Sequence, residues 1–219
     1  MLGRRVKLPV LAEIAGPPAG TRVWSLRRED FVALEKALPL LEGQRVVLVS
    51  GEGEAAPVAA IALATAAGSF GLRTILVECD LAHPCLAAQI GLAAAPGLHE
   101  YLRWEAEPQD VIQPVVLGGP AASGASEPLV CICAGRPATK AETLLGLQSF
   151  AHMVAKLRGA YELVVLSGPP PASEPAACAV AARQADVVAA ALAAQEGRSI
   201  RKAIGRLPVP AVGAIAVGG

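Results

Sequence analysis

The sequence predicts an α/β fold with a doubly wound, mostly parallel sheet and helices on both of its faces. Six apolar runs of strand length alternate with stretches of helical periodicity, an order that is typical of parallel sheets. Most of these runs contain no alternating polar residues, as expected for strands that are covered on both sides. The six predicted strands are 46–50, 74–79, 129–134, 163–167, 187–193 and 212–217.

The strands 46–50, 74–79 and 163–167 are expected to be adjacent in the centre of the sheet, because each of them is apolar without interruption. Helical patterns fill the intervals between the strands, and one more precedes the first central strand. These predicted helices are 30–41, 55–69, 85–90, 98–103, 141–158, 176–183 and 198–206.

The chain is expected to fold as a single domain. Its 219 residues are enough for one α/β domain with a full core. The sequence contains no linker long enough to divide them. We assign residues 1–44 to an N-terminal strand and helix extension and residues 45–219 to the core.

The composition argues against several classes of protein. Hydrophobic residues make up 53% of the chain and charged residues 17%, so disorder is not expected. The formal net charge is zero and aromatic residues are 3%, so a nucleic-acid partner is not expected. The first ten residues lack the apolar core of a secretory signal. We therefore expect a cytoplasmic protein that reaches the inner face of the cell membrane only through a partner.

The five cysteines are expected to be reduced thiols. Cys131 and Cys133 alternate in an apolar run, so both side chains should lie on the same face of a strand. They are either half of a metal site or buried core thiols. No second Cys or His pair at a suitable spacing accompanies them, and no metal site is predicted.

A glycine-rich turn follows the first central strand. Gly51-Glu52-Gly53-Glu54 joins the strand 46–50 to the alanine-rich helix. Strand, glycine-rich turn and helix are the setting of a P-loop, in which backbone N–H groups and a helix N-terminus hold phosphates. The alternative is that both glycines only form a turn.

The groups that grip a nucleotide in a P-loop are missing from this turn. A P-loop needs a Lys that reaches the terminal phosphates and a Ser or Thr hydroxyl that binds Mg²⁺. The corresponding positions hold Glu54, Ala55, Ala56 and Pro57. Glu52 and Glu54 would also repel a triphosphate.

Further motifs follow in a characteristic order. They are LPVLAEI at 8–14, LVECDLAHP at 76–84, IGLAAAPGL at 90–98, YLRWEAEPQDVIQP at 101–114, GRPATKAETLL at 135–145 and YELVVLSGPP at 161–170. Their order and spacing resemble the cytoplasmic kinase domain of bacterial tyrosine kinases (BY-kinases) of capsule and exopolysaccharide synthesis. That family belongs to the MinD/ParA-like P-loop proteins, and the resemblance covers nearly the whole chain.

The departures from this family fall where it does its chemistry. In the second Walker segment the first aspartate is replaced by Glu78, Asp80 remains, and His83 stands in place of an arginine. In Walker B the aspartate is replaced by Ser167. The C-terminal tyrosine cluster of such kinases is absent, because the only tyrosines are Tyr101 and Tyr161.

The resemblance implies that ATP and Mg²⁺ are the family's cofactors, and the replacements imply that this chain binds them very weakly or not at all. Glu78 and Asp80 are the relic catalytic positions, although Asp80 is equally well interpreted as a cap of the next segment. The relic nucleotide site comprises Gly51, Glu52, Gly53, Glu54, Ala55, Ala56 and Ser167.

The resulting hypothesis is a catalytically degraded BY-kinase-like protein, a pseudokinase that regulates or scaffolds exopolysaccharide or capsule polymerisation and export. The resemblance implies three partners: the cytoplasmic part of a membrane chain-length-determinant (Wzz-like) protein, an active kinase homologue, or further copies of the chain. One alternative is an active ATP-dependent tyrosine kinase in which Glu78 and Asp80 hold Mg²⁺. The other is a MinD/ParA-like positioning ATPase.

The degraded loop itself carries one structural hypothesis. A helix N-terminus with free N–H groups attracts an anion whether or not a nucleotide is bound. We expect Glu54, rather than Glu52, to fold back onto the N–H groups of residues 55–58. The alternative is that both carboxylates point into solvent.

Overall fold

The computed structural model describes residues 8–16, 26–115, 129–193 and 197–218. Their strands form one eight-stranded sheet in the order β1-β8-β7-β2-β6-β3-β5-β4. All neighbouring strands are parallel except β4 and β5, which are antiparallel. The strands are β1 (Val10–Ala15), β2 (Val46–Ser50), β3 (Thr74–Glu78), β4 (Ile112–Pro114), β5 (Val130–Ile132), β6 (Leu163–Ser167), β7 (Val187–Ala193) and β8 (Ala211–Gly218).

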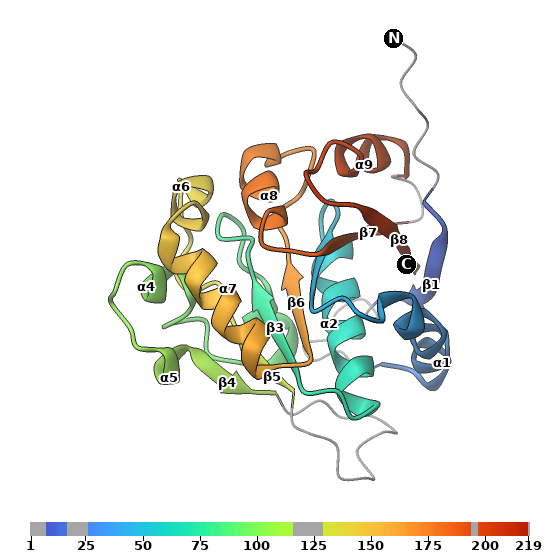
Figure 1. Ribbon diagram of the computed structural model, residues 1–219, viewed down its shortest axis with the longest axis horizontal. Helices are drawn as coiled ribbons and strands as arrows, with labels where there is room; N and C mark the ends of the chain where they lie inside the picture. The colour runs from blue at the N-terminus through green and yellow to red at the C-terminus, as the bar shows by residue number, and fades with distance from the viewer. Residues whose placement is uncertain (1–7, 17–25, 116–128, 194–196, 219) are drawn as a thin grey trace.

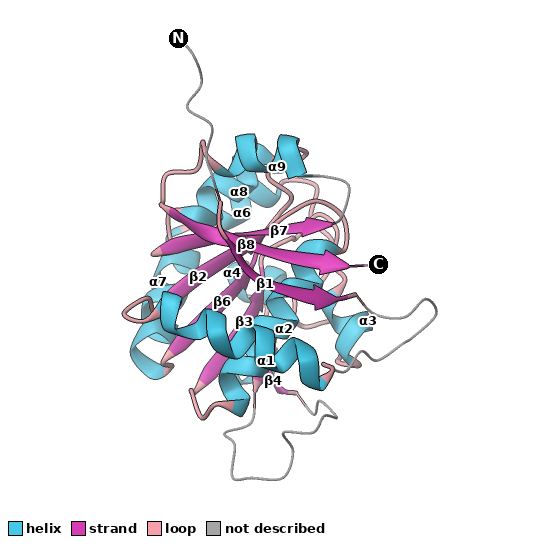
Figure 2. Ribbon diagram, turned by 90° about the vertical axis from the view of Figure 1, so that its right-hand side faces the viewer, coloured by secondary structure: helices cyan, strands magenta, loops and turns pink. Residues whose placement is uncertain are grey.

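Helices cover both faces of the sheet, so the predicted fold class is confirmed (Figures 1 and 2). The helices α1, α2 and α3 pack on one face, and α4 to α9 pack on the other. Their bounds are α1 (Arg28–Ala37), α2 (Ala55–Ser69), α3 (Leu86–Ile90), α4 (Leu98–Leu102), α5 (Pro108–Val111), α6 (Ala141–Leu145), α7 (Gln148–Ala160), α8 (Pro175–Ala182) and α9 (Gly197–Ile204).

Successive side chains of the central strands point alternately into the two hydrophobic cores, one on each face of the sheet. In β2, Val47 and Val49 contribute to the core under α2, whereas Val46 and Leu48 contribute to the core under α7 and α8. Because both faces are covered, a strand at this position must be apolar at every residue. β6 lies between β2 and β3, so the three predicted central strands are indeed adjacent.

Helix α2 lies in the middle of its face and is buried almost along its whole length. Its residues are mostly alanine, and their small side chains allow the helix to pack closely on β2, β6 and β7. Within the described part of the chain, no helix combines the length and the apolar character needed to cross a membrane.

Two predicted helices differ in the structure. The single helix predicted over 141–158 is wrong: α6 ends at Leu145, and α7 begins only at Gln148. Leu147 between them is extended (φ −66°, ψ 145°). The helix predicted over 30–41 becomes α1 followed by the 3₁₀ turn η1 (Leu38–Leu41), which contains Pro39 and therefore lacks one backbone donor.

The N-terminal extension predicted for residues 1–44 supplies β1 and α1. β1 pairs with β8 at the edge of the sheet, and α1 packs against β1 and α2. Asp30 of α1 is buried, and its carboxylate accepts a hydrogen bond from the Ala15 N–H at the end of β1 (2.9 Å). The extension is thus continuous with the same sheet and core.

Candidate functional site

The loop after β2, the end of β3 and the loop after β6 meet at one edge of the sheet. The three strands are parallel neighbours, so their carboxyl ends come together, where ligands of such sheets bind. These segments surround a cavity of about 420 Å³. The predicted site residues that line it are Gly51, Glu52, Gly53, Glu54, Ala56, Glu78, Asp80 and Ser167.

The backbone of the glycine-rich turn favours glycine at both of its glycine positions. A Cβ atom at Gly51 would overlap the Ala191 carbonyl of β7, so this position must be glycine. Gly53 has a φ of +56°, in the left-handed region. Helix α2 then begins at Ala55, which is buried and does not line the cavity.

The expectation that Glu54 folds back onto the helix N-terminus is wrong. Glu54 is exposed and makes no side-chain capping hydrogen bond to α2. Its backbone is already helical (φ −81°, ψ −6°), whereas a capping side chain reaches the N–H groups of the first turn from an extended backbone.

The carboxylate of Glu52 makes the contact that bridges the site. It accepts hydrogen bonds from the Ala172 N–H (2.8 Å) and from the Ser173 hydroxyl (2.7 Å). Both donors belong to the loop between β6 and α8. Glu52 therefore ties the glycine-rich turn to the opposite wall of the cavity.

Glu78 lies at the end of β3 and is 1% exposed. One carboxylate oxygen accepts hydrogen bonds from the N–H groups of Cys85 (2.6 Å) and Leu86 (2.8 Å), and the other accepts one from Ala134 (2.9 Å). Burial raises the pKa of Glu78, and the three N–H groups oppose that rise. Both oxygens are engaged by the backbone, so this side chain connects β3, α3 and the end of β5.

Asp80 is half-buried and closes a short turn. Its carboxylate accepts a hydrogen bond from the His83 N–H (3.0 Å), and the His83 ring lies 3.6 Å away. Burial raises the pKa of Asp80. The contact corresponds to the capping interpretation, in which an aspartate satisfies the backbone N–H of the following turn.

Ser167, which the resemblance places at the Walker B aspartate, ends β6 beside Glu78, with which it pairs in the sheet. It is 3% exposed. Ser50, the last residue of β2, donates a hydrogen bond from its hydroxyl to the Pro169 carbonyl (2.7 Å). The Ser50 hydroxyl thus ties the end of β2 to the loop after β6.

Sequence reasoning missed Ser173 and Cys85, which also line the cavity. Ser173 lies in the Pro-rich loop between β6 and α8, and its hydroxyl gave no separate signal in the sequence. Burial raises the pKa of the Cys85 thiol well above its ordinary value, so this thiol stays protonated at neutral pH.

Cys131 and Cys133 lie away from the cavity. Both are fully buried in the core on the α2 and α3 side, so the prediction that they share one face of a strand is confirmed. Among the residues that the structure describes, no group of three or more His, Cys, Asp or Glu side chains is placed to hold a metal ion.

The sequence matches no protein-family model, and no curated protein matches it. Solved structures do match. The kinase domain of the Escherichia coli tyrosine kinase ETK has a TM-score of 0.78 at 17% identity, covering 96% of this chain and 90% of that one. The BceF tyrosine kinase domain has a TM-score of 0.76 at 19% identity, covering 96% and 93%.

The chain has the fold of a bacterial tyrosine kinase domain. This confirms the fold expected from the resemblance. A more distant match is cobyrinic acid a,c-diamide synthase from Mycobacterium smegmatis with bound ATP analogue and magnesium, with a TM-score of 0.59 at 20% identity over 78% of this chain and 72% of that one. The chemistry of the present chain has to be judged from its own residues.

The side chains of the cavity do not fit a nucleoside triphosphate with Mg²⁺. No Lys or Arg is present among the described residues that line it, whereas four carboxylates are: Glu52, Glu54, Glu78 and Asp80. Glu78 has both oxygens on backbone donors, and Glu52 occupies the donors of the facing loop. The negative charges of these carboxylates would repel the negatively charged phosphates of a nucleotide bound in the cavity.

Proposed function

We propose that the chain is a pseudokinase: a protein with the fold of a bacterial tyrosine kinase domain that acts by binding other proteins. The observation that carries this proposal is the bridge from Glu52 to Ala172 and Ser173. A side chain of the glycine-rich turn itself joins the two walls of the cavity. The described lining residues include no Lys or Arg, so no cation is available there to hold a phosphate in place of this bridge.

The expected loss of nucleotide affinity can be estimated from the P-loop groups that this chain lacks. A hydrogen bond to a charged group contributes roughly 1.5–3 kcal/mol. Loss of the Lys and of the Mg²⁺-binding hydroxyl together should weaken nucleotide binding by roughly two to four orders of magnitude. Pro57 removes one more N–H from the first turn of α2. We therefore infer that ATP with Mg²⁺ binds very weakly or not at all.

The biological role inferred from the resemblance is a regulatory or scaffold subunit of exopolysaccharide or capsule polymerisation and export. Its partners would be the cytoplasmic part of a Wzz-like chain-length determinant, an active kinase homologue, or other copies of the chain. The protein would then lie in the cytoplasm, against the membrane through its partner. Zero net charge supports the absence of a nucleic-acid partner.

The active-kinase alternative requires Glu78 and Asp80 to bind Mg²⁺. Against it, the oxygens of Glu78 accept three backbone hydrogen bonds, which a metal would have to displace. Against a MinD/ParA-like positioning role, the described residues that line the cavity include no Lys or Arg that could bind a phosphate.

Calorimetric titration with ATP and Mg²⁺ tests the proposal, with the BceF kinase domain as the positive control for the assay. We expect no measurable heat of binding to this chain under conditions in which the control saturates. A dissociation constant in the low micromolar range would revive the active kinase. In parallel, the cytoplasmic segment of the Wzz-like protein of the same organism, titrated into the chain, should bind; failure of that segment and of an active homologue to bind would overturn the scaffold role.

A further inference from the structure

Trp104 is the most exposed large apolar side chain in the described part of the molecule, with 84% of its surface accessible. It follows α4, and its backbone is in the left-handed region, with a φ of +64°. The Trp104 N–H donates to the Tyr101 carbonyl (3.0 Å) and the Glu105 N–H to the Glu100 carbonyl (2.8 Å). These two bonds form a Schellman helix end, in which glycine is the favoured residue at the position of Trp104.

Two unfavourable features therefore coincide at one residue. A bulky residue with a positive φ is strained, and an exposed indole leaves a large apolar surface in water. Aromatic residues are only 3% of this chain, so an exposed tryptophan does not reflect its composition. Backbone strain and exposed tryptophan at one site are characteristic of a binding anchor.

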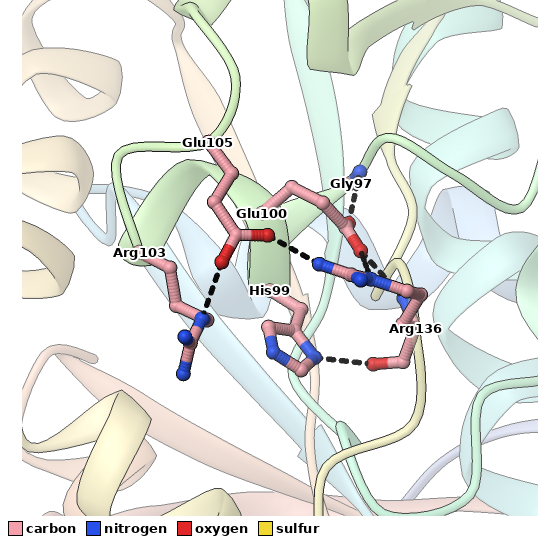
Figure 3. Close-up of polar contacts among 6 residues, drawn as sticks. All are labelled: Gly97, His99, Glu100, Arg103, Glu105 and Arg136. Carbon is pink, nitrogen blue, oxygen red and sulfur yellow. Dashed lines mark hydrogen bonds and ion pairs between the residues drawn. The ribbon is translucent and has the colours of Figure 1, made fainter.

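Polar contacts link the residues that flank Trp104 in sequence to Glu100 and Arg136 (Figure 3). Glu100 accepts hydrogen bonds from the Gly97 N–H and the Arg136 Nε, both at 2.8 Å. Arg136 also pairs with Glu105, and Glu105 pairs with Arg103 at 2.6 Å. The side chains of Arg103 and Glu105, on both sides of Trp104, are thus held by ion pairs, so the backbone that carries the indole needs little further ordering on binding.

A groove of suitable character lies between α8 and α9. Its volume is about 350 Å³, within the range of sites that enclose small organic groups. The walls are apolar or small, and two cations, Lys202 and Arg206, stand at its rim. The apolar and small lining residues are Pro171, Ala172, Pro175, Ala179, Ala203 and Leu207.

The charges around Trp104 and around the groove have opposite signs. Arg103 and Arg136 are neutralised by their carboxylate partners. Glu107 and Asp110 follow Trp104, are exposed, and have no cationic partner among the described residues. Lys202 and Arg206 likewise have no acidic partner there. An arginine or lysine at the groove is also well placed to stack on an indole.

We propose that Trp104 of one copy of the chain inserts into the α8–α9 groove of a second copy. Figure 1 shows α4 and α9 far apart within one molecule, so Trp104 cannot fill the groove of its own chain. The contact is head-to-tail, because the two copies use different surfaces. It deepens the proposed function, on which it rests for the idea that the chain acts by binding, and it names the surfaces for the self-contact; nucleotide binding has no part in its test.

Complementary variants test the contact directly. Trp104→Gly removes the anchor, and the double variant Lys202→Glu with Arg206→Glu reverses the rim of the groove at two exposed positions. Sedimentation equilibrium of the wild-type protein, at low ionic strength and at concentrations up to about 0.5 mM, should show self-association. Added salt should weaken this association. Each variant alone should raise the dissociation constant at least about 30-fold. An equimolar mixture of the two variants should form a discrete heterodimer, because it retains one intact anchor and one intact groove.

Leu40→Ser is the matched control, since Leu40 is 60% exposed on a different part of the surface and should leave association unchanged. Folding of every variant is checked by circular dichroism. A wild-type protein that stays monomeric throughout the concentration range would overturn the proposal. So would a Trp104→Gly protein that associates like wild type, or a mixture of the variants in which no heterodimer forms.

Discussion

The Ser173 hydroxyl donates a hydrogen bond to the Glu52 carboxylate at 2.7 Å, across 121 residues of sequence. The same carboxylate accepts the Ala172 N–H at 2.8 Å. One acidic side chain thus performs, within the protein, the bridging that a ligand performs between the walls of a binding site.

Replacement of Glu52 by Ala should loosen the loop between β6 and α8. Two hydrogen bonds to a charged group are lost at a partly exposed site, so the free energy of unfolding should fall by about 1 kcal/mol. Hydrogen exchange of the Ala172 amide should become faster. Glu54→Ala is the control in the same turn: Glu54 is exposed and caps nothing, and its removal should leave both measurements unchanged. Equal effects of the two substitutions would contradict the bridge.

Glu78→Gln should destabilise the protein more strongly than Glu52→Ala. The buried carboxylate accepts three backbone N–H groups, whereas a glutamine turns one acceptor into a donor that faces a donor. The expected loss is about 2–3 kcal/mol in the free energy of unfolding, measured with urea. Asp80→Asn, at a half-buried turn, should cost less. A Glu78→Gln protein as stable as wild type would show that Glu78 does not join β3 to its neighbours.

A single restored cation should not restore ATP hydrolysis. Phosphoryl transfer needs the Lys, the metal and the metal ligands together, and Ser167 stands where the resemblance places the Walker B aspartate. Glu54→Lys and Ala55→Lys, each alone, should remain inactive in a phosphate-release assay. Clear ATP turnover by either variant would mean that the site is less degraded than its residues indicate.

Trp104→Gly should raise the stability of the isolated chain. The substitution relieves a left-handed backbone at a Schellman position, and the greater freedom of glycine in the unfolded state offsets part of the gain. We expect an increase of about 1 kcal/mol in the free energy of unfolding, seen as a higher urea midpoint at protein concentrations too low for association. A decrease would show that Trp104 stabilises its own chain.

Acid should destabilise the protein in part through Glu100. Burial opposes ionisation of this carboxyl, but hydrogen bonds from the Gly97 N–H and from Arg136 outweigh it and lower the pKa of Glu100 below its ordinary value of 4.5. The folded state then binds fewer protons than the unfolded state. This contribution to stability is therefore present above pH 4.5 and is lost as the pH falls toward the lowered pKa. Between pH 7 and about pH 3.5 the urea midpoint of Glu100→Gln should fall less than that of wild type; an identical fall would rule out the role of Glu100.

Local patterns were enough to predict the central sheet. β2 and α2 begin and end at the predicted residues, because unbroken apolar strands and an alanine-rich helix are visible in sequence. The break at Leu147 was missed, since the helical pattern continues through it and only the extended backbone of that residue separates α6 from α7.

The site was predicted in its location and misjudged in its contacts. Parallel topology brings the ends of β2, β3 and β6 together whatever their side chains are. The choice of Glu54 over Glu52 failed because it considered only the local helix end. The partner of Glu52 comes from a loop about half the chain away, and the sequence contains no signal for such a contact. Trp104 carried a weak signal: a tryptophan stands after a short helix, where glycine is the usual residue.

The position of β1 has a consequence for how the chain folds. In the sheet its single neighbour is β8, so the first of the described strands pairs with the last of them. While the chain is being synthesised, β1 therefore has no neighbour in the sheet until β8 has been made. Contacts between such distant segments form slowly, because the entropy cost of closing a long loop comes before the contacts stabilise the chain. The pairing of β1 with β8 should accordingly be a late event in folding, and β8 presents an open edge until β1 joins it.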